Sequence, residues 1–307
     1  MSSKKDNIMN EYPYASQNMK KANFLNVYNE ITPHSYFHEM NSIQYRIPDE
    51  AKPYLDAVIN FISEYKSSGE TVRILDFGCS YGVLSAVLKH GLSFQELISH
   101  YSAAESQASS VFASLQRDQA LLSRRRAVRD LHITGVDRAE RAVLYALEAG
   151  LLDSGIPHDF EAERLQVNKE GVEKFDLIVS TGCIGYVGEK AFRNLFAVIP
   201  NSRPLIACFV LRMFDYCPIS DVLSDLGYVT KHFENISLRQ RSFSSDTEMQ
   251  HTIKCVRALG KNTAGKEDVG FLFADLFLSF PAGVEQSKLT GVLNRLRFDS
   301  DVKTRES

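Results

Sequence analysis

The stretch Thr71–His90, with the sequence TVRILDFGCSYGVLSAVLKH, constrains the fold of this chain more than any other. Residues 72–75 include the apolar side chains of a short buried strand, and residues 83–88 place apolar side chains at helical spacing. Between them lies the glycine turn Asp76–Gly82. Glycines let a ligand approach the backbone closely, and the start of a helix offers free N–H donors. We therefore expect an α/β fold with a nucleotide-type site at the carboxyl end of this strand.

The spacing of the glycines limits which type of nucleotide the turn can bind. A dinucleotide site needs G-x-G-x-x-G, but Ser80 stands where the middle glycine falls, and no Gly-Lys-Ser or Gly-Lys-Thr of a P-loop follows. The turn instead resembles motif I of the class I S-adenosylmethionine-dependent methyltransferases, in which a strand ends in Asp or Glu before a glycine turn. The alternative is a tight turn without a ligand. The resemblance implies that the cofactor, S-adenosyl-L-methionine, contacts Asp76, Gly78, Cys79, Ser80 and Gly82.

Two later stretches fit the same resemblance in the expected order. Residues 132–137 indicate a second short strand, and residues 139–149 a helix. In the family, an acid at the end of this strand binds both ribose hydroxyls, a role that falls here to Asp137, with Arg138 beside it. A carboxylate suits that role because it has acceptor oxygens for two neighbouring O–H donors. Residues 175–182 resemble motif IV, whose end faces the methyl group and holds Ser180, Thr181 and Gly182.

The chain also departs from the family pattern. From Gly82 to Asp137 is 55 positions, whereas about 20 separate the glycine turn from the ribose acid in the usual α/β unit. We therefore expect an inserted helical cap at about residues 91–130, whose Arg124–Arg126 run forms a solvated face or clamps a substrate anion. Motif IV lacks the Asn/Asp-Pro-Pro-Tyr/Phe ending of enzymes that methylate amino groups on bases or glutamine, which argues against those substrates.

The leader, residues 1–69, is rich in aromatic side chains, from Tyr12 onward. Rings in a segment without a core of its own must contact something else. They form either a helical segment on the sheet edge or, as in many small-molecule methyltransferases, a lid over the cofactor. Tyr45 and Arg46 are placed to reach the cofactor carboxylate. His34 and His38 are four apart after a helix-starting proline, which predicts an exposed pair, or a base or substrate contact at His38.

The second half of the chain completes the sheet. Residues 159–161 form the third strand or its loop, and the apolar run 204–212 indicates the fifth strand, with Arg212 pointing into the site crevice. Two further β-prone runs, at 229–243 and 270–280, resemble the terminal antiparallel pair of the family. The resemblance implies a doubly wound, seven-stranded, mostly parallel sheet in the order 3-2-1-4-5-7-6, with strand 7 antiparallel. We expect the cofactor domain at residues 70–283 and a polar, peripheral tail at 284–307.

Composition limits the partners of the protein. The 307 residues are 44% hydrophobic and carry a net charge of −3 with acids and bases interspersed, which provides no basic field for nucleic acid. No apolar run reaches the ~18 residues of a membrane span. The five cysteines form no C-x-x-C pair and suit reduced thiols, so we expect a cytoplasmic protein.

These observations predict an S-adenosylmethionine-dependent methyltransferase that acts on a small-molecule acceptor, of the kind found in specialised metabolism. Its substrate-side candidates are His38, Tyr186 and Arg212, of which Tyr186 either contacts substrate or packs beneath its loop. Two alternatives stay open. One is an NAD(P)-dependent oxidoreductase, because Asp137 suits NAD ribose, although the missing middle glycine and the lack of a Tyr-x-x-x-Lys pair weigh against it. The other is a non-catalytic S-adenosylmethionine-binding protein. The sequence names neither the acceptor atom nor an oligomeric state.

Overall fold

The computed structural model describes residues 13–24, 26–102, 110–125, 127–166, 173–199 and 202–303, without the side chains of residues 297–303. Tyr12 and Arg126 of the sequence analysis lie outside these residues. A seven-stranded sheet has the order β3-β2-β1-β4-β5-β7-β6, as expected. Its strands are β1 Val72–Phe77, β2 Leu131–Asp137, β3 Ser154–Pro157, β4 Leu177–Ser180, β5 Leu205–Leu211, β6 Tyr228–Ser242 and β7 Phe271–Pro281.

The central strands bring their carboxyl ends to one edge of the sheet. β1 is parallel to both of its neighbours, β2 and β4, and β4 is parallel to β5. Every residue of β5 is buried, which explains its continuous apolar sequence. β7 is antiparallel to β5 and to β6, so the expected direction of strand 7 is confirmed. The glycine turn, the end of β2 and the end of β4 therefore meet on the same side of the molecule.

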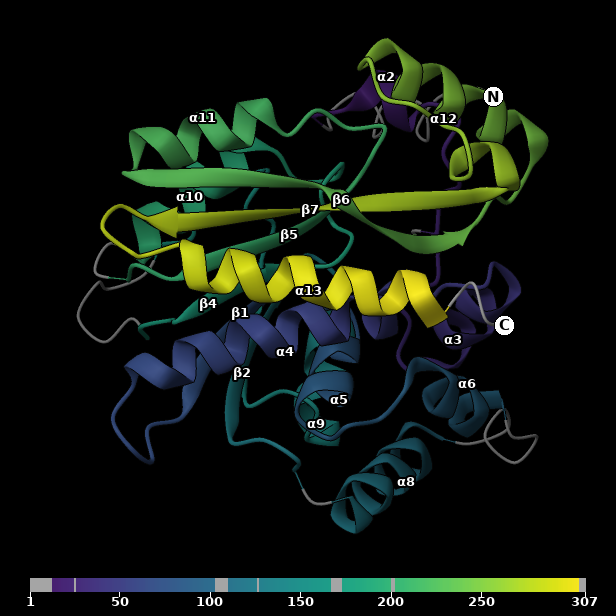
Figure 1. Ribbon diagram of the computed structural model, residues 1–307. Helices are drawn as coiled ribbons and strands as arrows, with labels where there is room; N and C mark the ends of the chain where they lie inside the picture. Colours follow the sequence, from purple (N-terminus) through teal and green to yellow (C-terminus); the bar gives the residue numbers. More distant parts are fainter. Residues whose placement is uncertain are drawn as a thin grey trace.

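Helices cover both faces of the sheet (Figure 1). α4 and α13 cross its front, whereas α10 and α11 lie together on the other side. α9 follows β2 and contacts β2 and β3. The helices are α2 Ala15–Asn18, α3 His34–Ser42, α4 Ile47–Tyr65, α5 Val83–Leu88, α6 Phe94–Ser102, α8 Val111–Arg124, α9 Glu140–Ala149, α10 Glu189–Val198, α11 Cys217–Asp225, α12 Asp246–Ala258 and α13 Ser287–Lys303, with a 3-10 turn, η1, at Glu267–Val269.

Residues 159–161 form the loop after the third strand, which is one of the two expected alternatives, and the strand itself is Ser154–Pro157. Two other expectations about these elements are wrong. The tail is not peripheral, because Leu289 and Leu293, four positions apart in α13, are buried where α13 contacts α4. The insertion does contain helices, but α6 contacts α3 and α8 contacts α9, so its described helices support the neighbouring helices rather than capping the site.

The leader is tied to three separate parts of the fold. The hydroxyl of Tyr14 donates to the carbonyl of Asp215, 2.6 Å away. The buried amide of Asn18 donates to the carbonyl of Gly185 at 2.6 Å. The N–H of Ala22 donates to a carboxylate oxygen of Glu248 in α12 at 2.8 Å. These bonds hold residues 14–22 against the loop after β4 and against α12.

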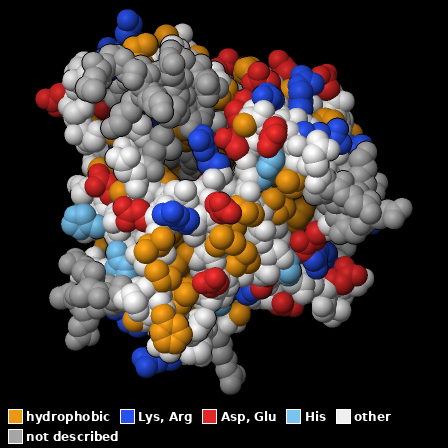
Figure 2. Space-filling view, turned by 180° about the vertical axis from the view of Figure 1, so that it is seen from behind, with side chains coloured by type: hydrophobic (Ala, Val, Ile, Leu, Met, Phe, Trp, Pro, Cys, Tyr) orange, Lys and Arg blue, Asp and Glu red, His pale blue; other side chains and the backbone are white. Residues whose placement is uncertain are grey.

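The surface carries both signs of charge. Figure 2 shows acidic and basic side chains interspersed with apolar ones on the described part of the face seen from behind. This agrees with the small net charge of −3. Within the described ranges, no helix combines the length and the apolar character that crossing a membrane requires.

Candidate functional site

A cavity of about 410 Å³ lies at the carboxyl ends of β1, β2 and β4. Its size is within the usual range for small-molecule sites, roughly 300 to 1,000 Å³. Most of the expected cofactor residues share its wall, although they come from three strands and the leader. Those that line it are Tyr45, Asp76, Gly78, Cys79, Ser80, Asp137, Arg138, Thr181 and Gly182, together with the substrate-side candidate Tyr186.

The turn between β1 and α5 needs its glycines for geometric reasons. Gly78 has φ +89°, and a Cβ atom there would lie 2.5 Å from the Cβ of Cys183, in the loop after β4. Ser80 also has a positive φ, +48°, which is uncommon for a residue with a side chain. The N–H groups of Gly78 and Cys79 donate to the carbonyl of Val136 at 2.8 and 3.1 Å. The turn is thereby fixed against the end of β2.

Two expected cofactor residues do not line the cavity. Gly82 precedes α5 with φ +75° and faces Ala146 in α9 and Leu151 just after that helix. Ser180 is fully buried, and its hydroxyl lies 3.1 Å from the sulfur of Cys183. Both residues support the loops that form the wall.

Two carboxyl groups, the buried Asp76 and the half-buried Asp137, line the cavity. Asp137 accepts the N–H of Ser80 and the N–H of Ala139, one on each oxygen and both at 2.9 Å. Asp76 is 1% exposed, and its Oδ2 has no hydrogen-bond partner among the described residues. Burial, and then the charge on Asp137, raise the pKa of Asp76 to about 8, and burial raises the pKa of Asp137. An unpaired buried carboxyl next to another carboxyl favours a cationic partner.

The rest of the wall comes from residues that the sequence analysis did not select as site residues. From the leader these are Lys21, Phe24, Tyr28, Asn29, Tyr36 and Met40, and from β6 they are Gln240 and Arg241. Gln240 faces Gly182, where a Cβ atom would lie 3.0 Å from its amide nitrogen. The aromatic content of the leader was the only sequence signal for this wall. We find no sequence signal for the wall residues of β6, because the position of β6 depends on its pairing with β7.

Arg241 is neutralised by a buried carboxylate in α12. It donates to both oxygens of Glu248, at 2.5 and 3.0 Å. Although burial opposes ionisation, these bonds and the guanidinium charge lower the pKa of Glu248 to about 2. The same carboxylate accepts the N–H groups of Ala22 and Ser244. This ion pair therefore joins β6, α12 and the leader at the cavity wall.

Three phenols in the wall, those of Tyr28, Tyr36 and Tyr45, stay protonated. Burial raises the pKa of Tyr28 and Tyr36 well above its ordinary value, and burial together with the charge of Asp76 does the same for Tyr45. Tyr28 and Tyr36 are in edge contact, with ring centroids 5.4 Å apart. The wall thus offers apolar ring surface with neutral O–H groups, suited to an organic molecule.

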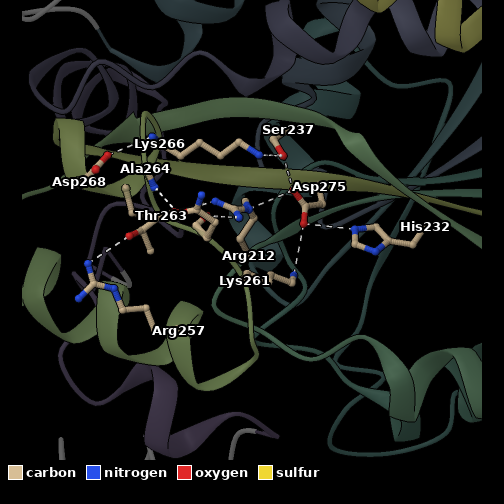
Figure 3. Close-up of polar contacts among 12 residues, drawn as sticks. Arg212, His232, Ser237, Arg257, Lys261, Thr263, Ala264, Lys266, Asp268 and Asp275 are labelled. Atoms are coloured by element: carbon tan, nitrogen blue, oxygen red, sulfur yellow. Dashed lines mark hydrogen bonds and ion pairs between the residues drawn. The ribbon is translucent and has the colours of Figure 1, made fainter.

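Two substrate-side candidates lie away from this cavity, so these expectations are wrong. Arg212 is 5% exposed and belongs to a separate polar cluster (Figure 3). It donates to Glu267 at 2.6 Å and to the carbonyl of Asn262 at 2.7 Å, and its Nε lies 3.3 Å from Asp275. Arg212 follows β5, and Asp275 lies in β7, the antiparallel neighbour of β5. The guanidinium of Arg212 therefore pairs with a carboxylate from the neighbouring strand. His38 is exposed, because Tyr36, Phe37 and Met40 form the buried face of α3.

The histidine pair does not form a metal site within the described structure. His34 Nδ1 lies 3.1 Å from the hydroxyl of Thr32, and its Nε2 lies 3.5 Å from Arg117. No group of three His, Cys, Asp or Glu side chains in the described ranges is arranged to hold a metal ion.

Comparisons with known proteins concern the fold only. No protein-family model and no curated protein matches the sequence. Among solved structures, the plantazolicin methyltransferase BpumL bound to SAH is 13% identical, with a TM-score of 0.35 over 76% of this chain and 84% of that chain. A TehB-like SAM-dependent methyltransferase from Corynebacterium glutamicum is 16% identical, with a TM-score of 0.34 over 75% and 98%. The [4+2]-cyclase SpnF is 12% identical, with a TM-score of 0.32 over 74% and 81%. Similarity at this level does not identify a reaction.

Proposed function

We propose that this protein is a methyltransferase that uses S-adenosyl-L-methionine to methylate a small-molecule acceptor. The observation that carries the proposal is a pair of carboxyls, the buried Asp76 and the half-buried Asp137, beside a positive-φ glycine turn at the ends of neighbouring parallel strands. Charge, hydrogen-bonding capacity and shape at this point all suit an amino-acid-linked nucleoside.

The residues present fit the proposed cofactor. Asp76 has an unpaired buried oxygen that suits the cationic amino group of S-adenosyl-L-methionine. Each oxygen of Asp137 accepts one backbone N–H and keeps acceptor capacity for a ribose hydroxyl. Asp159 and Phe160, in the loop after β3, also line the cavity and supply a polar group and an aromatic ring for the base. When bound, the cofactor supplies an electrophilic methyl group.

The chain's own residues position the acceptor and exclude water. The aromatic leader and Gln240 cover the end of β4. Because a transferred methyl group needs an aligned nucleophile, holding the acceptor in place supplies most of the catalytic effect. Tyr186 lies in this wall and is the remaining substrate-side candidate. We assign no general base, because a base is needed only for an acceptor that is protonated at neutral pH.

Substitution of Asp137 tests the proposed cofactor site. Asp137→Ala should weaken binding of S-adenosylhomocysteine by about 1 to 3 kcal/mol, through loss of charge-assisted hydrogen bonds. Isothermal titration measures the affinity, and circular dichroism verifies that the variant is folded. Asp225→Ala, at a side chain that is 73% exposed, is the matched control. Equal affinity of wild type and folded Asp137→Ala would remove Asp137 from the site.

A further inference from the structure

Three long cationic side chains line the cavity, and they differ in how they are neutralised. Arg241 forms a two-point ion pair with Glu248. Arg138 lies 3.5 Å from a carboxylate oxygen of Asp159. Lys21, in contrast, has no carboxylate within 4.0 Å of its ammonium in the described part of the chain. A cation that faces a ligand cavity without a counter-ion favours an anionic ligand.

The ammonium of Lys21 is held in position rather than extended into solvent. It donates to the hydroxyl of Tyr186 at 2.7 Å and lies 4.2 Å from the centroid of that ring. The backbone on either side is fixed, since Lys21 N–H donates to the carbonyl of Asn18 and Ala22 N–H donates to Glu248. An ammonium has three donors, and the Tyr186 hydroxyl takes one of them. The remaining donors are available to a ligand at a preorganised position.

We propose that Lys21 and Tyr186 bind a carboxylate or phosphate group of the methyl acceptor, which makes this an enzyme for an acidic small molecule. The inference rests on the proposed function for the role of the ligand. The acids Asp76 and Asp137 lie on the strand ends, whereas Lys21 belongs to the leader that supplies Phe24 and Tyr28 to the wall. The cavity therefore offers acidic groups from the strand ends and a cationic group from the leader. The other source of the same chemistry is the carboxylate of the cofactor itself.

Two sets of ligands separate the sources. Inorganic phosphate and benzoate, titrated with and without S-adenosylhomocysteine, probe the anion site directly. S-adenosylhomocysteine and 5′-methylthioadenosine, which lacks the amino-acid carboxylate, probe the cofactor. The variants are Lys21→Met, Tyr186→Phe and, as matched control, Lys20→Met at the exposed neighbouring residue.

We expect Lys21→Met to weaken phosphate or benzoate binding by about tenfold or more, because a charge-assisted hydrogen bond is lost. Tyr186→Phe should have a smaller effect, and Lys20→Met none. Affinity for S-adenosylhomocysteine should stay the same in all three variants. If Lys21→Met instead weakens S-adenosylhomocysteine but not 5′-methylthioadenosine, the anion belongs to the cofactor and the assignment to the acceptor is overturned.

Two further outcomes separate this inference from the proposed function. The anion site is wrong if Lys21→Met binds each of the four ligands as tightly as the wild type does. It is also wrong if the wild type binds neither anion and Lys21→Met retains the wild-type affinity for S-adenosylhomocysteine. If the wild type binds neither sulfur ligand but loses anion binding on Lys21→Met, the anion site stands and the proposed cofactor falls.

Discussion

Replacing Asp76 by asparagine is expected to stabilise the free protein and to weaken its affinity for the cofactor. Burial and the charge on Asp137 raise the pKa of this carboxyl from 3.8 to about 8. The folded protein therefore binds a proton that the unfolded chain releases, so the free energy of unfolding falls as the pH rises between these two values. Asparagine has the same shape but no charge, so the free energy of unfolding of Asp76→Asn does not fall with pH for this reason.

The size of the effect follows from the pKa shift. Each pKa unit corresponds to about 1.36 kcal/mol. Asp76→Asn should therefore raise the free energy of unfolding by up to about 2 kcal/mol at pH 5 and up to about 5 kcal/mol at pH 8. At both pH values the variant should bind S-adenosylhomocysteine more weakly, because the unpaired oxygen that suits its amino group is replaced.

Urea denaturation of the wild type and Asp76→Asn at pH 5 and pH 8, followed by circular dichroism, measures this prediction. Asp225→Asn serves as the control for removing an acid at an exposed position. Burial of Asp76 would not oppose its ionisation as we expect if Asp76→Asn raised the free energy of unfolding equally at the two pH values. The same conclusion would follow if Asp76→Asn lowered the free energy of unfolding at both.

The remaining predictions concern the turn, the polar cluster and proton linkage. Gly78→Ala should destabilise the protein by about 1 to 3 kcal/mol more than Gly69→Ala in urea denaturation, because both have φ near +90° but only the first meets a neighbouring side chain; equal losses would contradict this. Arg212→Met should cost about 3 to 5 kcal/mol by leaving the buried carboxylate of Glu267 without its guanidinium partner, yet titration with S-adenosylhomocysteine should show an unchanged affinity, and a large loss of affinity would return Arg212 to the site. Binding of S-adenosylhomocysteine at pH 7 should release a proton as Asp76 ionises against the ligand's cation, measured by calorimetry in buffers of different ionisation enthalpy; proton uptake would contradict that pairing.

Local patterns explain why much of the fold was predictable. The apolar strand, the acid and the glycine turn at residues 72–82 lie within one contiguous stretch, and their positions depend on neighbours in sequence. The same holds for the second strand with Asp137 and for the buried fifth strand. The order of the strands came from the resemblance of three such stretches, and the sheet confirms it.

Long-range pairing explains what the sequence analysis missed. Arg212 follows a parallel strand, which suggested the crevice, but its partners Glu267 and Asp275 are more than fifty residues away in sequence. Gln240 and Arg241 reach the cavity because the β6–β7 pair continues past the end of β5, with register irregularities. The wrong expectation for His38 could have been avoided, since the apolar spacing of α3 already places His38 opposite the buried face.

Titration of the wild-type protein with S-adenosylmethionine, S-adenosylhomocysteine and NAD in parallel tests the central claim most directly. The account predicts micromolar binding of both sulfur ligands and no binding of NAD. Binding of NAD without the sulfur ligands would contradict the claim and indicate an oxidoreductase on the same fold.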